Sequence, residues 1–229
     1  MRRRSLGRII YTMHGPRKRP RFLALGDSYT LGEGVRPEES WPWQLVSQLR
    51  RRGADVDDPE VVARTGWTSE ELLEAIRMRK DIFAARAPWD LVTILIGVND
   101  QYRGLLPEVY RDHLREILDA AIASAAGPES VIVISIPDWS VTPFADSRDR
   151  AAIAAAIDVL NEVNREEAAE AGAIWIDVAP ASRRASDDLS LIAEDGLHPA
   201  PAMYFEWTEL ILPAASEVLR ARAGGSVAR

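Results

Sequence analysis

Short apolar runs alternate with longer stretches of helical periodicity along most of the chain. The apolar runs have the length of strands and lie at Phe22–Leu25, Val61–Ala63, Leu91–Ile96, Val131–Ile136 and Ile174–Val178. The helical stretches lie between and after them, at Trp41–Arg52, Ser69–Arg79, Pro107–Ala126, Asp149–Ala171 and Pro201–Arg222. Because the strand-like runs are almost continuously apolar, they indicate strands that are buried on both faces. We therefore predict an α/β fold, a three-layer α/β/α sandwich with a central parallel sheet of about five strands.

Local signals mark the ends of several of these helices. Thr68 followed three residues later by Glu71 is typical of a helix start, since the two side chains can cap each other's backbone N–H groups. Gly53 and Gly172 stand where two helices should stop. The polar stretch Ser140–Arg150 is predicted to be a loop near the carboxyl ends of the strands.

The composition is that of one enzyme-sized domain without disulfide bonds. Of the 229 residues, 47% are hydrophobic and 28% are charged, which is ordinary for a globular domain. No apolar stretch approaches the roughly 20 residues of a membrane-spanning helix, so we expect no membrane span. The chain has no cysteine, which favours a cytoplasmic location and excludes a thiolate metal site.

Basic residues gather at the N-terminus of an otherwise acidic chain. Residues 1–21 hold eight basic side chains and no acidic one, whereas the net charge of the whole chain is −7. We expect residues 1–20 to be a disordered basic arm, an over-extended start with Met13 as the true initiator, or a tether to an anionic surface. Its apolar part, Ile9–Met13, is too short for a signal peptide. The acidic remainder argues against nucleic-acid binding, since phosphate would be repelled.

Candidate catalytic residues lie at two places that are far apart in the sequence. Ser28 follows the first strand directly, and Asp195 and His198 stand three residues apart near the other end. A Ser nucleophile, a His base and a carboxylate that orients the base are the parts of a hydrolytic triad. Of the three histidines, His14 lies in the basic arm and His113 in a charged helix. His198 is therefore the candidate general base.

Four short blocks in order resemble the SGNH hydrolases, also called the GDSL esterase/lipase family. These are Gly26-Asp27-Ser28, Gly66, Gly97-Val98-Asn99-Asp100 and Asp195-x-x-His198-Pro199. The resemblance covers about residues 21–215. It implies a flavodoxin-like sandwich for a domain at 21–222, with 223–229 as a flexible tail. The chain departs from the family pattern at two positions. The family often has Leu after the serine, where this chain has Tyr29. The family also often has Asn before the glycine of the second block, where this chain has Thr65. Both departures bear on substrate preference.

The resemblance also implies roles for the candidate residues. Ser28 attacks an ester carbonyl, His198 takes and returns the proton, and Asp195 orients the imidazole. The oxyanion hole would consist of the backbone N–H groups of Ser28 and Gly66 and the side-chain amide of Asn99. Asp27 and Asp100 are interpreted as structural, through turn bonding for the first and capping or orientation of Asn99 for the second. The partner is a small acyl ester, and neither a cofactor nor a metal is expected.

Two tryptophans follow these blocks closely. Trp67 comes directly after Gly66, and Trp139 follows the fourth strand. Both are candidates for lining a substrate pocket, although packing in the core is the commoner role of tryptophan. The loop Ser140–Arg150 is a candidate lid.

Other classes fit the sequence less well. A non-catalytic flavodoxin-like binding protein remains the alternative, but no Gly-rich phosphate loop is present and such a module needs no Asp-x-x-His. An ordinary α/β-hydrolase would show Gly-x-Ser-x-Gly around its nucleophile, which Ser28 lacks. Three scattered histidines provide too few ligands for a metal-dependent hydrolase. The sequence does not select among lipid esters, acylated sugars, thioesters and aryl esters, and it leaves the oligomeric state open.

Overall fold

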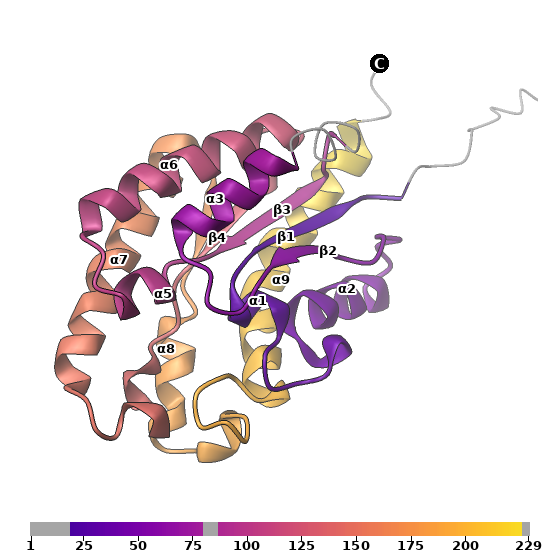
Figure 1. Ribbon diagram of the computed structural model, residues 1–229. Coiled ribbons are helices and arrows are strands. Elements are labelled where there is room, and N and C mark those ends of the chain that lie inside the picture. The colour runs from indigo at the N-terminus through magenta and orange to yellow at the C-terminus, as the bar shows by residue number, and fades with distance from the viewer. Residues whose placement is uncertain (1–18, 80–86, 226–229) are drawn as a thin grey trace, which may run out of the picture.

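The computed structural model describes residues 19–79 and 87–225 and has the predicted three-layer architecture (Figure 1). Five parallel strands form the central sheet: β1 (Phe22–Gly26), β2 (Glu60–Ala63), β3 (Leu91–Leu95), β4 (Val131–Ile134) and β5 (Ile174–Ile176). Their order across the sheet is β2-β1-β3-β4-β5. This is the flavodoxin-like order, so the prediction of the fold class is confirmed.

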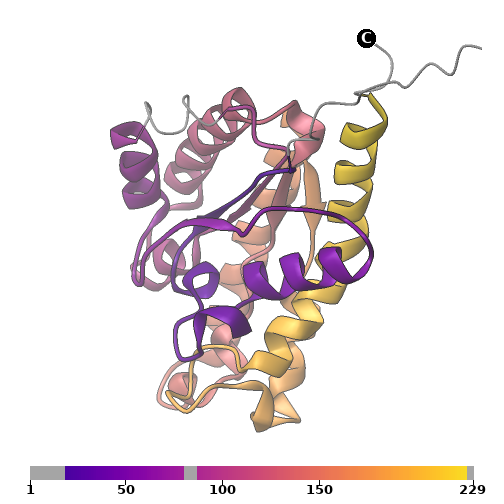
Figure 2. The same ribbon diagram turned by 90° about the vertical axis from the view of Figure 1, so that its right-hand side faces the viewer.

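Long helices cover both faces of the sheet. Helices α2 (Trp41–Arg51) and α9 (Pro201–Gly225) pack together on one face. On the other face lie α3 (Ser69–Met78), α6 (Pro107–Ser124) and α7 (Arg150–Ala171), as the edge-on view in Figure 2 shows. Strands β1, β3 and β4 are buried along their whole length between these layers. Their continuous apolar sequences follow from this burial on both faces.

The caps expected from sequence are present. The hydroxyl of Thr68 accepts from the N–H of Glu71, and the carboxylate of Glu71 accepts from the N–H of Thr68. Gly53 and Gly172 follow α2 and α7 with positive φ angles of 89° and 71°. An L-residue with a side chain rarely adopts this conformation, which explains glycine at both helix ends.

Among the described residues, three short α-helices were not predicted: α1 (Ser28–Leu31), α5 (Val98–Tyr102) and α8 (Ala179–Ser182). Each has four or five residues, too few to show a helical period in sequence. The predicted loop Ser140–Arg150 begins inside the 3₁₀ turn Trp139–Val141, contains a second 3₁₀ turn, Pro143–Ala145, and ends at the first residue of α7. A lid role for it stays a prediction.

The ends of the domain differ slightly from the sequence-based boundaries. Residues 1–18 of the predicted basic arm lie outside the described residues, but Arg19 pairs with Asp55 and the carbonyl of Pro20 accepts from Asp57. Helix α9 continues to Gly225, beyond the expected domain end at residue 222. The last part of the predicted tail, 226–229, lies outside the described residues. Within 19–79 and 87–225, no helix has the length and apolar character needed to cross a bilayer.

Candidate active site

Ser28 is the first residue of α1 and lies two residues beyond β1. The chain turns sharply here because the Asp27 carboxylate accepts from the N–H of Tyr29 and caps the short helix. Gly26 makes the turn feasible, since a Cβ at this position would lie 2.4 Å from the carbonyl oxygen of Leu95. The predicted turn bonding of Asp27 is therefore confirmed. The result is a serine side chain at the carboxyl edge of the sheet, next to the switch point between β1 and β3.

His198 reaches Ser28 from the loop before α9. The two side chains are 170 residues apart in sequence, yet Nε2 of His198 lies 3.0 Å from Oγ of Ser28. On the other side of the ring, Nδ1 lies 2.6 Å from Oδ2 of Asp195. An ionised carboxylate can only accept, so Nδ1 carries the proton and Nε2 is free to accept from the serine hydroxyl. The structure brings together the three residues predicted from sequence.

Asp195 is held by its own turn. Its Oδ1 accepts from the backbone N–H groups of Leu197 and His198, both at 2.9 Å. Burial by itself would raise the pKa of Asp195, but the bonds from the His198 ring and from these two N–H groups outweigh it and lower the pKa. The carboxylate is consequently ionised at neutral pH and stabilises the Nδ1–H tautomer of His198.

Gly66 and Asn99 approach the serine from two other strand ends. Gly66 has a positive φ of 84° in a turn closed by the bond from Trp67 N–H to Arg64 carbonyl, a backbone conformation that favours glycine. The N–H groups of Ser28 and Gly66 donate to no residue that the structure describes. Asn99, on α5, donates one amide hydrogen to the carbonyl of Trp67 at 2.9 Å. Its second amide hydrogen donates to no residue that the structure describes.

Asp100 connects the two segments that hold Gly66 and Asn99. Its buried carboxylate accepts from the backbone N–H and from the hydroxyl of Ser69, at 2.9 and 2.5 Å. His113 Nδ1 lies 2.9 Å from the same hydroxyl. Asp100 therefore caps α3, the helix after the Gly66 turn, rather than its own helix α5. Together with the bond from Asn99 to Trp67, this contact sets the Gly66 turn against α5.

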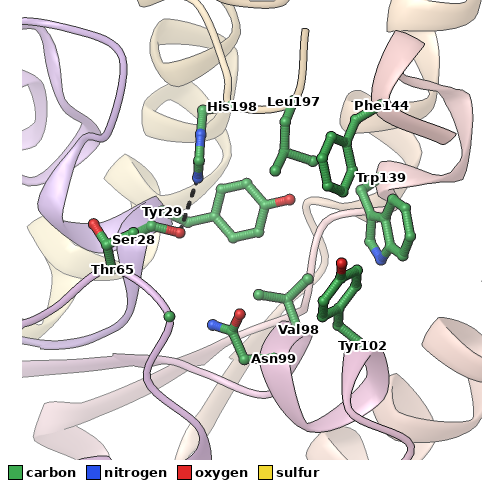
Figure 3. A pocket seen from close by; sticks show the side chains of 11 residues that line it. Ser28, Tyr29, Thr65, Val98, Asn99, Tyr102, Trp139, Phe144, Leu197 and His198 are labelled. Carbon is green, nitrogen blue, oxygen red and sulfur yellow. Dashed lines mark hydrogen bonds between the residues drawn. The ribbon is translucent and has the colours of Figure 1, made fainter. Parts of the chain in front are cut away.

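A cavity of about 190 Å³ opens beside the serine, and Figure 3 shows its lining. Ser28, His198, Thr65, Gly66 and Asn99 form the polar end. The remaining lining residues are mainly apolar or aromatic: Tyr29, Val98, Tyr102, Trp139, Phe144 and Leu197.

Of the two candidate pocket tryptophans, only Trp139 lines this cavity. Trp67 is partly buried against the core and contributes its backbone carbonyl to Asn99. The pocket assignment of Trp67 is corrected accordingly, because the turn at Gly66 directs this side chain to the core. The predicted loop contributes Phe144, which packs against Trp139 with ring centroids 5.8 Å apart.

Several lining residues were missed in the sequence, although most had a usable signal. Tyr29, Val98 and Leu197 are direct neighbours of Ser28, Asn99 and His198. Tyr102 lies four residues after Val98 on the same helix and therefore on the same face. For Phe144 no sequence signal existed beyond its place in the polar loop.

The buried Asp27 provides a test of the site's electrostatics. Burial raises its pKa from 3.8 to about 8, although the bond from Tyr29 N–H opposes the shift and the charge of Asp100 adds to it. Between these two pH values the native protein holds a proton that the unfolded chain has lost, so stability falls as pH rises. The slope for one proton is at most about 1.4 kcal/mol per pH unit. We expect Asp27→Asn to be more stable than wild type near pH 8 and above, with the difference shrinking toward pH 4.

Urea unfolding of wild type and Asp27→Asn between about pH 4 and pH 8 measures this difference in the free energy of unfolding. Asp112→Asn is the control for the chemical change itself, because the Asp112 side chain is 76% exposed and the substitution there removes no buried carboxyl group. A stability difference between Asp27→Asn and wild type that is constant with pH would contradict the assignment.

No group of three or more His, Asp or Glu side chains within 19–79 and 87–225 is arranged to hold a metal ion.

A parallel sandwich with Ser, His and Asp hydrogen-bonded at its carboxyl edge is the arrangement of the SGNH hydrolase class. A family model described as the GDSL-like lipase/acylhydrolase family matches residues 24–204, which include all five triad and oxyanion-hole candidates. The chain belongs to this family.

Individual relatives are more distant. An arylesterase from Vibrio mimicus is 29% identical over 106 residues, which are 46% of this chain and 50% of that protein. The match thus spans half the length of this curated relative. Among solved structures, TesA has a TM-score of 0.67 at 23% identity, covering 86% of this chain and 98% of TesA. The esterase EstA from Pseudoalteromonas sp. has a TM-score of 0.65 at 18% identity, with 87% and 98% covered. The acetylxylan esterase Axe2 from Geobacillus stearothermophilus has a TM-score of 0.62 at 20% identity, with 87% and 94% covered. At these identities the structural likeness concerns the fold.

Proposed function

We propose that this protein is a serine esterase that cleaves a carboxylic ester through an acyl-enzyme on Ser28. The observation that carries the proposal is the unbroken line of hydrogen bonds from Asp195 through His198 to Ser28, at 2.6 and 3.0 Å. A non-catalytic binding protein of the same fold would gain nothing from a serine hydroxyl directed at an oriented imidazole.

The first half-reaction forms the acyl-enzyme. Oγ of Ser28 attacks the ester carbonyl while Nε2 of His198 accepts the hydroxyl proton, which gives a tetrahedral intermediate and an imidazolium stabilised by Asp195. His198 then returns the proton to the departing alcohol oxygen as its bond to carbon breaks. In the second half-reaction a water molecule takes the place of the serine as nucleophile. His198 accepts its proton and finally gives it back to Ser28, which releases the acid.

The negative charge of each tetrahedral intermediate needs donors that are already in place. The unpaired N–H groups of Ser28 and Gly66 and the second amide hydrogen of Asn99 are suited to this task. The bonds that hold Asn99 and the Gly66 turn exist before substrate arrives, so little reorganisation is required during the reaction.

The size of the cavity favours a small or medium ester over one with a long acyl chain. Its volume of about 190 Å³ lies below the range of roughly 300–1,000 Å³ typical of drug-sized ligands. Its wall beyond the polar end is mainly apolar and aromatic. Aryl esters and short-chain esters are therefore the substrates we would test first, and the similarity to an arylesterase points the same way. A cytoplasmic location and the absence of nucleic-acid binding stay predictions from composition, and cell fractionation tests the first.

Active-site labelling tests the proposal directly. A fluorophosphonate probe should modify Ser28 and no other serine, because only an oriented base makes a serine hydroxyl this nucleophilic. Peptide mass spectrometry locates the label, and His198→Ala should prevent it. Labelling at another serine, or equal labelling of His198→Ala, would refute the proposed mechanism.

A further inference from the structure

Tyr29, the residue after the proposed nucleophile, lies between the triad and the apolar wall of the cavity. The residue is only 3% exposed. The ring packs edge-on against the imidazole of His198, with centroids 5.7 Å apart, and against Trp207 at 5.9 Å. These contacts fix the ring, so the direction of its hydroxyl is fixed as well.

The hydroxyl of Tyr29 points into the cavity. Figure 3 shows it directed away from Ser28, toward the space between Leu197 and Val98 and the side where Trp139 lies. It forms no hydrogen bond with any residue that the structure describes.

The neighbouring polar atoms of the aromatic wall already have partners. Nε1 of Trp139 donates to Gln101 at 2.8 Å, and the hydroxyl of Tyr102 accepts from Arg148 at 3.3 Å. Among the described residues that bound this part of the cavity, the Tyr29 hydroxyl is therefore the side-chain polar group that takes part in no hydrogen bond at all.

This hydroxyl is a donor at any pH at which the enzyme would work. Burial first, and then the charges of Asp27, Asp138 and Asp195, raise the pKa of Tyr29 above its ordinary value. The phenol thus stays protonated, and its O–H can donate to a substrate oxygen atom that lies within hydrogen-bond distance.

We propose that the Tyr29 hydroxyl is a specificity-determining group that donates a hydrogen bond to an oxygen atom of the substrate. The preferred ester would then carry an ether, hydroxyl or carbonyl oxygen within an otherwise apolar group, on its acyl or its alcohol side. A wholly apolar group of the same shape leaves the phenol unpaired in a desolvated site, which costs free energy. The inference rests on the esterase function proposed above and names the substrate chemistry of the same site.

Two pairs of matched esters test it, each differing by a methylene replaced with an ether oxygen. On the acyl side, p-nitrophenyl methoxyacetate is compared with p-nitrophenyl butyrate. On the alcohol side, 4-methoxyphenyl acetate is compared with 4-ethylphenyl acetate. For each pair, the ratio of kcat/KM for the oxygenated ester to that for the apolar ester is measured in wild type, Tyr29→Phe and Tyr204→Phe. Taking ratios between variants cancels the intrinsic reactivity of the esters.

The matched control is Tyr204. It is also buried, its hydroxyl has no hydrogen-bond partner among the described residues, and its ring packs on Trp207 at 5.3 Å. It does not line the cavity, so Tyr204→Phe should keep the wild-type ratios. Both variants retain the aromatic ring, and circular dichroism with thermal unfolding checks that they fold.

The expected result is that Tyr29→Phe lowers the ratio roughly three- to tenfold in one pair, the usual net contribution of one hydrogen bond between neutral groups. The pair that responds identifies the side of the ester that faces Tyr29. Ratios within about 1.5-fold of wild type in both pairs would overturn the inference, as would an equal loss in Tyr204→Phe. Failure of the esterase proposal looks different, because Ser28→Ala would then keep hydrolysing all four esters.

Discussion

Ser28→Ala and His198→Ala should each lower kcat for p-nitrophenyl acetate by about 10⁴- to 10⁶-fold, and Ser28→Ala should leave the thermal midpoint nearly unchanged. The nucleophile and its base act as one unit, so the loss of either removes the covalent route entirely. The double variant should therefore be no worse than the single ones. Ser28→Ala should change stability little, because it removes one hydrogen bond of 3.0 Å. His198→Ala also removes the 2.6 Å bond to Asp195 and the ring contact with Tyr29, so its thermal midpoint should fall further. Initial rates and thermal unfolding of the three variants measure both quantities.

His113→Ala provides the matched histidine control. The His113 ring contacts the hydroxyl of Ser69, the first residue of α3, and not Ser28. Most of the wild-type kcat should remain in this variant. Ordinary turnover by Ser28→Ala, or a loss in His113→Ala as large as that in His198→Ala, would contradict the assignment of the triad.

Asn99→Ala should lower kcat on the order of 10²- to 10³-fold, with little change in KM. The reason is that the second amide hydrogen of Asn99 meets a negatively charged oxygen only in the transition state, whereas the ground-state carbonyl needs it far less. Asn99→Asp should be at least as harmful. A carboxylate there would face both the new negative charge and the carbonyl of Trp67, which the amide now satisfies at 2.9 Å. Steady-state kinetics of the two variants, with saturation curves for KM, provide the measurement.

A merely structural role of Asn99 makes a different prediction. Loss of the bond to Trp67 alone would disturb the Gly66 turn, lower the thermal midpoint and act mainly on KM. If Asn99→Ala showed that pattern, with kcat within about threefold of wild type, the oxyanion hole would rest on the backbone N–H groups of Ser28 and Gly66.

The strands and the long helices could be predicted from sequence because their signals are local. Phe22–Leu25 is apolar without interruption, and the observed strand is one residue longer. Thr68 and Glu71 are close enough in sequence to cap each other, so the start of α3 was visible without any tertiary information. The short helices α1 and α5 were not visible, since both depend on how the chain leaves a buried strand.

The features of the candidate site also fall into those that the sequence predicts and those that depend on tertiary structure. The sequence by itself determined the fold class, the choice of Ser28, His198 and Asp195 as the proposed nucleophile, base and carboxylate, and the contact of Asp195 with His198, which a three-residue turn produces locally. Only the tertiary structure decided the 3.0 Å contact between His198 and Ser28, because it depends on the packing of α9 and the preceding loop against β1. Tertiary structure also decided that Trp139 lines the cavity and Trp67 does not, and that the hydroxyl of Tyr29 points into the cavity. The physical reason is that sequence spacing specifies neighbours along the chain, whereas the direction of a side chain follows from the backbone turn beneath it and the rings packed around it.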